Sequence, residues 1–413
     1  MDNWMWTGNK DGLLGGFLRV VLAAVLMTML TAPANAGSRE QAKRIHERIA
    51  GVPPSDTVLG QMQNAIDGTE PSCSQYGSVT GPQCAAYIAM ENHSFYNVTL
   101  KNFAAPWTNR DRSVFVPIND YIAKFIGMIR DDRAFNTLLS DDITYIGAPG
   151  TVSALPSANN NDHYEQLEAG NHNLKDVLQF AQQSSVPGSV PPSATAGVIT
   201  SRAAAEAFFV AGTNRAMFRF TMVNHFCADM EQLHDPRMPP DRIRQDVSRS
   251  PGGDSRLFLN NCVGCHTGMD PMAQAFAYSN YVESDPAGRG SIEFTDGIVQ
   301  PKYFNNDLNF PQGYRTPDDH WTNYWRNGQN RYLGFYGPGN GEGDGAKSLG
   351  AELGNSDAFS SCQVKKVFQT VCLREPETAA DHVRVDQIVA TFQGTGYRMK
   401  QVFADTAEYC MGQ

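Results

Sequence analysis

Apolar side chains recur at helical spacing in several separate blocks of the chain. The block over residues 117–139 follows the i, i+3, i+4, i+7 pattern of a helix with one buried face. Its periodic positions are Ile122, Phe125, Ile126 and Ile129. Blocks of similar character cover residues 39–62 (interrupted at Pro53-Pro54), residues 201–229 and residues 348–410. This distribution predicts a mostly α-helical protein.

Two long segments lack this period and are rich in residues that favour turns. Residues 147–192 contain many Ser, Asn, Gly and Pro, and we expect a boundary loop there with one helical insert near residues 173–183. Residues 283–345 are aromatic and rich in Gly and Asn. No internal repeat is present in the sequence. The prediction is therefore a set of helices joined by long irregular loops.

The first 36 residues have the layout of a secretory signal peptide. Lys10 and Arg19 precede an apolar run over residues 20–30, and Ala34-Asn35-Ala36 offers the short side chains that a signal peptidase accepts. We expect cleavage after Ala36 and export to the periplasm or another extracytoplasmic space. That space is oxidising, so cysteines there tend to form disulfides.

An uncleaved membrane anchor over residues 12–30 is the alternative interpretation of this segment. The apolar run that follows Arg19 has about half of the ~20 residues needed to span a bilayer. A cleaved signal is therefore the favoured prediction.

Composition and charge narrow the class of protein. The chain has 413 residues, of which 41% are hydrophobic and 18% charged, and its net charge is −10. These values exclude a disordered chain, a coiled coil and a collagen-like repeat. We expect no nucleic-acid partner, because binding phosphates needs clustered Lys and Arg and no basic block is present.

One short motif carries strong chemical information. Cys262-Val263-Gly264-Cys265-His266 has the CxxCH spacing of a c-type haem attachment site. Two thiols three positions apart on a helical turn can reach the two vinyl groups of one haem, and His266 then lies under the iron as its proximal ligand. The sequence predicts one covalent haem c, held by Cys262 and Cys265.

Two other interpretations of the motif are less favoured. A redox disulfide between Cys262 and Cys265 would be expected within a βαβ pattern, which is absent around the motif. A zinc site would need a second pair of ligands at similar spacing, and none follows nearby. Haem attachment is therefore favoured.

The sixth ligand of the iron is left open by the sequence. A Met ligand would favour electron transfer, whereas an open position would favour ligand binding or catalysis. No methionine lies between residues 273 and 398, where small cytochromes c carry theirs. The candidates are Met238, His320 and Met399, then an open or water-bound position, then His225, Met230 and His234.

The other six cysteines form an even set, so we expect three disulfides. Cys73 and Cys84 bracket a short loop and are expected to pair. Cys362 and Cys372 would lie about 15 Å apart on a continuous helix, which is too far for a disulfide. Each is therefore expected to pair with Cys227 or Cys410, joining the last helices to the haem region.

The surroundings of the motif resemble the planctomycete-type cytochrome c domain proteins. The residues that carry the resemblance are Gly212-Thr213-Asn214-Arg215, a helix up to Cys227, Pro239-Pro240, and Asp270-Pro271 with an aromatic segment over residues 276–281. Ala273 stands where members commonly carry Gly, and the insert over residues 283–345 departs from the compact pattern. The likeness spans about residues 118–410. It implies an exported haem protein with a particular order of domains, and it implies no substrate.

These observations predict a division of the chain into five parts. The parts are a signal peptide (residues 1–36), an N-terminal helical and loop region (37–117), a helical domain (118–195), a haem c domain with an irregular insert (196–345) and a C-terminal helical domain (346–413).

The expected function is one-electron transfer by an exported monohaem c-type cytochrome, with redox partner proteins or an envelope-associated complex as partners. One alternative is a haem-dependent oxidoreductase, such as a peroxidase-like enzyme or a dehydrogenase component. Another is a haem-containing structural subunit of an envelope assembly.

Overall fold

The computed structural model describes residues 36–209, 214–243, 255–284, 289–303 and 314–412. The predicted signal peptide and the alternative anchor over residues 12–30 lie outside the described residues, apart from Ala36. The expected fold class is confirmed, because the structure is mostly helical and contains only small antiparallel sheets within the described ranges. No helix among the described residues is long and apolar enough to cross a membrane.

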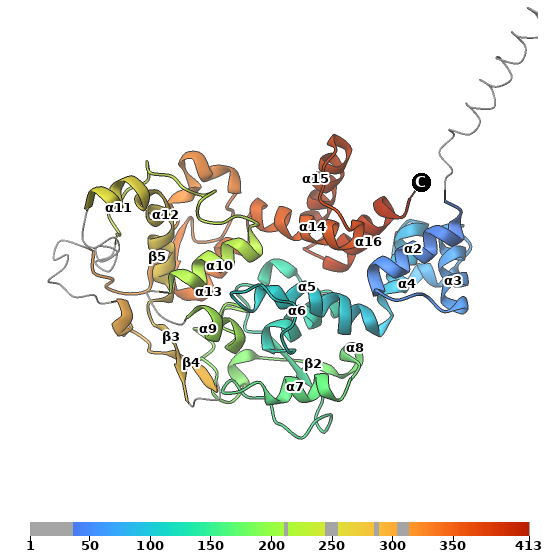
Figure 1. Cartoon of the computed structure of the whole chain (residues 1–413), viewed down its shortest axis with the longest axis horizontal. Coiled ribbons are helices and arrows are strands. Elements are labelled where there is room, and N and C mark those ends of the chain that lie inside the picture. Colours follow the sequence, from blue (N-terminus) through green and yellow to red (C-terminus); the bar gives the residue numbers. More distant parts are fainter. Residues whose placement is uncertain (1–35, 210–213, 244–254, 285–288, 304–313, 413) are drawn as a thin grey trace, which may run out of the picture.

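Together with short 3-10 and π-helical turns, the α-helices account for most of the described backbone (Figure 1). They are α2 (Ser38–Ala50), α3 (Asp56–Ile66), α4 (Gly81–Met90), α5 (Lys101–Ala104), α6 (Asp120–Arg130), α7 (Asp162–Ala169), α8 (Leu174–Val177), α9 (Arg202–Phe208), α10 (Arg215–His225), α11 (Ser255–Asn261), α12 (Val263–Ala273), α13 (Gly345–Gly354), α14 (Asp357–Cys372), α15 (Ala379–Gly394) and α16 (Met399–Cys410).

Three two-stranded antiparallel sheets are present in the described part of the chain. They pair β1 (Thr144–Gly147) with β2 (Leu178–Ala181), β3 (Ser279–Glu283) with β4 (Gly290–Phe294), and β5 (His320–Thr322) with β6 (Glu342–Asp344).

The two ends of the described chain pack together. The predicted break at Pro53-Pro54 separates α2 from α3, and the Ser55 hydroxyl accepts a hydrogen bond from the Val58 amide at the start of α3. Helices α2 and α4 pack against α16 (Figure 1). The Gln41 side chain donates to the Gly412 carbonyl at 3.0 Å.

Helix α6 lies at the centre of the molecule. Its residues from Tyr121 to Ile129 are all buried, so it is surrounded by other elements rather than exposing a polar face. The buried apolar side chains of the described residues form one main cluster that extends from Ala42 to Ala407. The cluster therefore includes residues from each of the four regions predicted after residue 36, and the domain boundaries stay a prediction.

The prediction for residues 147–192 was only partly right. The helical insert expected near residues 173–183 is the short helix α8 followed by strand β2, which pairs with β1. The sequence also missed α7, whose eight residues bury His163, Tyr164 and Leu167. Strand β2 forms through pairing with a partner more than thirty residues away in sequence (Thr144 opposite Ala181), so local periodicity could not reveal it.

The long amphipathic pattern over residues 201–229 is divided between two helices. Helix α10 begins at Arg215, directly after Asn214, which has a left-handed backbone with φ 57°. The described parts of residues 283–345 have no long helix, as expected, but they contain β4, the β5–β6 pair and three short 3-10 helices (Pro301–Tyr303, Tyr324–Arg326 and Gly328–Leu333). Short strands of three to five residues give too few alternations to be recognised from the sequence.

The cysteine predictions are confirmed. The structure contains disulfides Cys73–Cys84, Cys227–Cys362 and Cys372–Cys410. Cys362 and Cys372 lie on the continuous helix α14, as the argument against their pairing assumed. The second disulfide therefore joins the end of α10 to α14, and the third joins α14 to α16.

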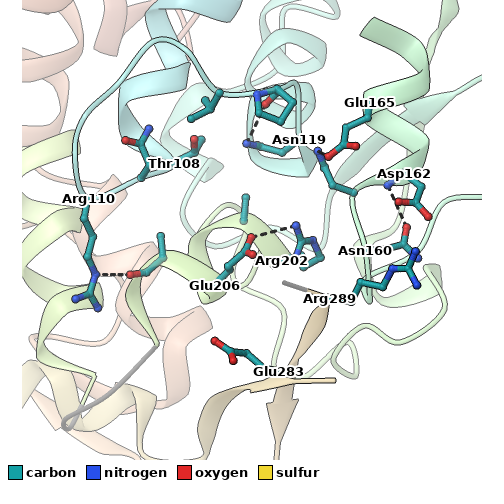
Figure 2. A pocket seen from close by; sticks show the side chains of 16 residues that line it. Thr108, Arg110, Asn119, Asn160, Asp162, Glu165, Arg202, Glu206, Glu283 and Arg289 are labelled. Carbon is teal, nitrogen blue, oxygen red and sulfur yellow. Dashed lines mark hydrogen bonds and ion pairs between the residues drawn. The ribbon is translucent and has the colours of Figure 1, made fainter. Parts of the chain in front are cut away.

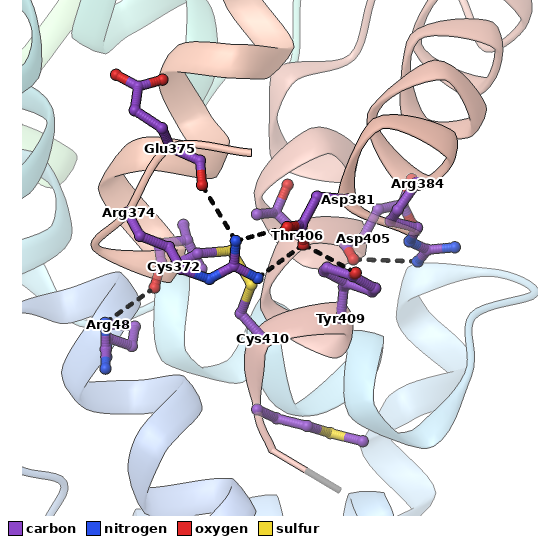
Figure 3. The surroundings of a disulfide bond; sticks show 12 residues. Arg48, Cys372, Arg374, Glu375, Asp381, Arg384, Asp405, Thr406, Tyr409 and Cys410 are labelled. Atoms are coloured by element: carbon purple, nitrogen blue, oxygen red, sulfur yellow. Dashed lines mark hydrogen bonds and ion pairs between the residues drawn. A yellow bond between two sulfur atoms is a disulfide. The ribbon is translucent and has the colours of Figure 1, made fainter. Parts of the chain in front are cut away.

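Next to Cys372–Cys410, the exposed Arg374 forms an ion pair with the buried Asp381 (Figure 3). Arg374 donates to both oxygens of Asp381, at 2.7 Å each. Asp381 also caps α15 by accepting the Thr378 amide, and it accepts the Tyr409 hydroxyl. The hydrogen bonds from Arg374 hold the pKa of Asp381 well below its usual range.

We predict that replacing both Cys227 and Cys362 by Ser lowers the free energy of unfolding by about 2–4 kcal/mol, because the disulfide closes a long loop in the unfolded chain. Its sequence separation is 135 residues, against 11 for Cys73–Cys84. The matched control, Cys73→Ser/Cys84→Ser, should lose less in chemical denaturation. Equal losses for the two pairs would contradict the loop argument.

A second prediction concerns Lys124, which is fully buried on α6 and donates to the Gly197 carbonyl at 2.8 Å. Burial lowers the pKa of Lys124 to about 8. The unfolded chain keeps this proton until about pH 10.4, so it binds more protons than the folded state above about pH 8. This group should therefore raise the stability by up to about 3 kcal/mol as the pH rises through that window.

The measurement compares urea unfolding of wild type and Lys124→Met from pH 7 to 10.5, so that other titrating groups cancel. In Lys124→Met, the free energy of unfolding should not show this rise with pH. Lys347→Met is the control, because Lys347 also donates to a backbone carbonyl, that of Pro192, but from the surface. The same pH dependence in wild type and Lys124→Met would show that Lys124 does not cause the rise.

Candidate functional site

The CxxCH motif forms the first turn of α12. Cys262 precedes the helix, and its carbonyl accepts hydrogen bonds from the Cys265 and His266 amides at 3.2 Å each. The Cys262 amide in turn donates to the Phe258 carbonyl on α11 at 2.9 Å. This helical turn makes the side chains of Cys262 and Cys265 neighbours, because positions i and i+3 lie on the same face.

Cys262 and Cys265 are free thiols, whereas the other six cysteines are paired. Both are partly buried, and the Cys265 thiol donates to the Met230 carbonyl at 3.4 Å. Burial raises the pKa of Cys265. The disulfide interpretation of the motif therefore finds no support in the structure.

No group of three or more His, Cys, Asp or Glu side chains that could hold a metal ion occurs within the described residues. In that part of the chain, the two thiols and His266 lack the fourth protein ligand that a structural zinc site needs.

His266 is oriented by a carboxylate one helical turn further along. Its Nδ1 lies 3.2 Å from each of the two oxygens of Asp270. A carboxylate only accepts hydrogen bonds, so Nδ1 carries the proton and donates it. Among the described residues Nε2 makes no hydrogen bond, and the side chain is 17% exposed. The imidazole therefore presents the lone pair of Nε2 away from Asp270.

Asp270 is itself fixed by Arg215. The Arg215 Nε donates to Oδ1 at 2.8 Å and Nη2 donates to Oδ2 at 3.0 Å, which is the two-pronged geometry of a strong ion pair. The Asp270 side chain is fully buried. Next to Arg215, the buried Asn214 side chain donates to the Phe276 and Ser279 carbonyls at 2.9 Å each. Helix α10 thus holds α12 at Asp270 and again just beyond its end.

The opposite face of α12 is tightly packed. Side chains added to Gly264 and Gly268 would overlap the rings of His234 and Trp325, with contacts of 2.3 and 2.1 Å. Successive helical residues are rotated by about 100°, so His266 faces about 160° away from both glycines. The imidazole therefore points away from the His234 and Trp325 side of the helix.

The structure places Met238 and His320 beside α12, without bringing either to the imidazole. Met238 packs on Gly328 next to Asp235, and the Asp235 amide donates to the Gly264 carbonyl, on the helix face opposite His266. The His320 ring lies 2.8 Å from Asp344 on the neighbouring strand and is 38% exposed. Strand β5 contacts α12, and the Gln274 side chain donates to Asp318 beside that strand.

Met399 and His225 lie in the core. Met399 begins α16, which packs against α2, α4 and α14, at a distance from α12 (Figure 1). His225 is buried with both ring nitrogens near polar partners: Nε2 lies 2.8 Å from the Tyr121 hydroxyl and Nδ1 lies 3.4 Å from the Gln363 amide nitrogen. Both ring nitrogens of His225 therefore already have polar partners in the core.

The remaining candidates for the sixth ligand are Met230 and His234. Both belong to a segment that packs against α12 on the side of Gly264 and Cys265. The Met230 carbonyl accepts from Cys265, and the His234 ring covers Gly264.

A polar cavity of about 780 Å³ lies apart from the motif (Figure 2). It is bordered by α9, the start of α7 and the end of β3, and its lining includes both acidic and basic side chains. Arg202 pairs with Glu206 at 3.0 Å and donates to the Tyr281 hydroxyl at 3.1 Å. Burial raises the pKa of Glu206. The cavity has the size of a small-molecule site and would favour a polar ligand.

Sequence reasoning missed the roles of Asp270 and Arg215. Both residues belong to the motifs that carried the family resemblance, but there they counted only as matching residues and no role was assigned to them. The spacing of His266 and Asp270, four residues apart on a helix, was the available signal. The contact with Arg215 spans 55 residues and has no local signature.

Comparison of the chain with protein-family models, with curated proteins and with solved structures gave no match. The resemblance to planctomycete-type cytochrome c domain proteins therefore stays a prediction.

We predict that Gly268→Ala lowers the free energy of unfolding by about 1–3 kcal/mol, because the new methyl group would overlap the fully buried Trp325. The matched control is Gly394→Ala at the end of α15, where an added methyl group meets nothing within 4 Å. That exchange should be neutral or stabilising by up to about 1 kcal/mol. Thermal and urea unfolding would test both, and an unchanged Gly268→Ala protein would contradict the packing of α12.

Proposed function

We propose that the protein is an exported monohaem c-type cytochrome that transfers single electrons to and from redox partner proteins. The observation that carries the proposal is the pair of free thiols, Cys262 and Cys265, followed directly by His266. The other cysteines form three disulfides. Two adjacent thiols left unpaired in such a chain support a different covalent use, and thioether links to haem are that use.

The residues of the motif fit this group. Cys262 and Cys265 would hold the haem by thioether bonds, and His266 would ligate the iron through Nε2, the nitrogen that makes no hydrogen bond in the described part of the chain. A haem bound there supplies reversible one-electron chemistry through its iron.

The firm packing of α12 supports a role in electron transfer, because a fixed helix would hold the haem ligand His266 in one position. The helix is held on one side by Arg215 and on the other by Asp235, whose carbonyl accepts the Thr267 hydroxyl at 3.0 Å. The Cys227–Cys362 disulfide fixes the far end of α10 to α14. If the ligands of the iron move little between its two oxidation states, the reorganisation energy of electron transfer stays small.

Export is the second part of the proposal. The three disulfides are compatible with an oxidising, extracytoplasmic compartment. The signal-peptide pattern of residues 1–36 supports the same location. The periplasm is the compartment in which covalent haem attachment and disulfide formation take place together in bacteria.

The alternative function is a haem-dependent oxidoreductase. The polar cavity in Figure 2, where Arg202 and Glu206 would bind a small polar ligand, lies apart from the motif and so does not by itself favour chemistry at the iron. This alternative needs an iron with a free coordination position, whereas electron transfer works best with a fully ligated iron.

The proposal predicts that the protein carries one covalent haem when it is produced together with cytochrome c maturation proteins. Haem staining after denaturing electrophoresis should be positive for wild type and negative for Cys262→Ser/Cys265→Ser. The control Cys73→Ser/Cys84→Ser exchanges another cysteine pair and should retain the stain. A wild-type protein without covalent haem would refute the proposal.

Absorption spectra of the reduced protein with and without carbon monoxide then separate the two functions. A low-spin spectrum that carbon monoxide leaves unchanged supports electron transfer. A high-spin spectrum that changes on its addition supports the oxidoreductase.

A further inference from the structure

The most distinctive polar arrangement near the motif is a chain of three side chains, His266, Asp270 and Arg215. The Asp270 carboxylate lies between the other two, with both of its oxygens 3.2 Å from His266 Nδ1 and each oxygen also bonded to Arg215. It is fully buried, so water does not screen its charge.

We propose that Asp270 is the positioning residue of the haem ligand His266, and that its charge lowers the reduction potential of the haem. This inference rests on the proposed function, because it concerns how the chain holds and tunes the group that His266 would bind.

The geometry first fixes the orientation of the imidazole. A histidine ring can carry its proton on either nitrogen, and the hydrogen bond on one nitrogen determines which is free for a metal. Asp270 holds the proton on Nδ1, so the lone pair lies on Nε2. Because both residues lie on one face of α12, four positions apart, the contact also limits rotation of the ring.

The charge of Asp270 then affects the iron. Histidine ligands that donate to a carboxylate are more basic and give more electron density to the metal than those that donate to a neutral group. Extra electron density stabilises the oxidised iron relative to the reduced iron. The reduction potential should therefore be lower than it would be with a neutral partner at this position.

Arg215 allows this buried carboxylate to stay charged and in place. Its guanidinium group binds the carboxylate in two-pronged fashion, and Asn214 anchors the start of α10. A purely structural role, in which Asp270 only fastens α12 to α10, is the competing explanation. The two roles differ in whether removing the charge of Asp270 changes the potential of a correctly folded holoprotein.

The test replaces Asp270 by Asn in the holoprotein, which keeps the shape of the side chain and an acceptor oxygen but removes the charge. We expect Asp270→Asn to retain covalent haem and to raise the midpoint potential in spectroelectrochemical titration. A tenfold change in the equilibrium for reduction corresponds to about 59 mV for a one-electron couple.

Asp381→Asn is the matched control. Asp381 is also a buried aspartate bound by both prongs of an arginine, Arg374, but it lies at the start of α15. The exchange should leave the midpoint potential unchanged while removing a comparable ion pair. A holoprotein of Asp270→Asn with the wild-type potential would overturn the proposal, as would an equal shift in Asp381→Asn.

A measurement on the wild-type holoprotein covers the case in which Asp270→Asn does not fold. The Nδ1 proton of His266 should appear in ¹⁵N-edited NMR spectra as a downfield resonance that exchanges slowly with water. Rapid exchange with water would overturn the proposal. Absence of covalent haem from wild type would instead refute the proposed function, so the two failures are distinguishable.

Discussion

The buried contact of Arg215 with Asp270 determines how the helix that carries the CxxCH motif is held. Charges are rarely buried unless they are paired, and here a fully buried carboxylate is bound at both oxygens by a guanidinium group. The same carboxylate accepts the Nδ1 proton of His266. One ion pair therefore fixes α12 against α10 and also orients the imidazole that the motif provides.

The rest of the described chain keeps this pair of helices in place. Cys227–Cys362 joins the end of α10 to α14, and Cys372–Cys410 joins α14 to α16, which packs on the N-terminal helices. On its other side, α12 packs against the rings of His234 and Trp325. These rings lie so close to Gly264 and Gly268 that no larger side chain fits there. A network of covalent links and close packing thus connects both ends of the described chain to the motif.

Features with a local origin could be predicted from the sequence. The helical class, the break at Pro53-Pro54, the Cys73–Cys84 disulfide and the exclusion of a Cys362–Cys372 pair follow from periodicity, backbone restrictions and reach along a helix. Which of Cys362 and Cys372 pairs with Cys227 was left open by the sequence and is given by the structure. Features that depend on distant partners could not. Strand β2 exists through its pairing with β1, and the partner of Asp270 lies 55 residues away. The sixth ligand of the iron was left open for the same reason, since spacing gives no information on which distant segment faces His266.

Peptide mapping under non-reducing conditions, on protein produced together with cytochrome c maturation proteins, tests the central claim most directly. The peptide that contains residues 262–266 should carry one haem bound through both cysteines, and the remaining six cysteines should be recovered as the three pairs seen in the structure. Recovery of that peptide without haem, as free thiols or as a disulfide, from cells with active cytochrome c maturation would contradict the account.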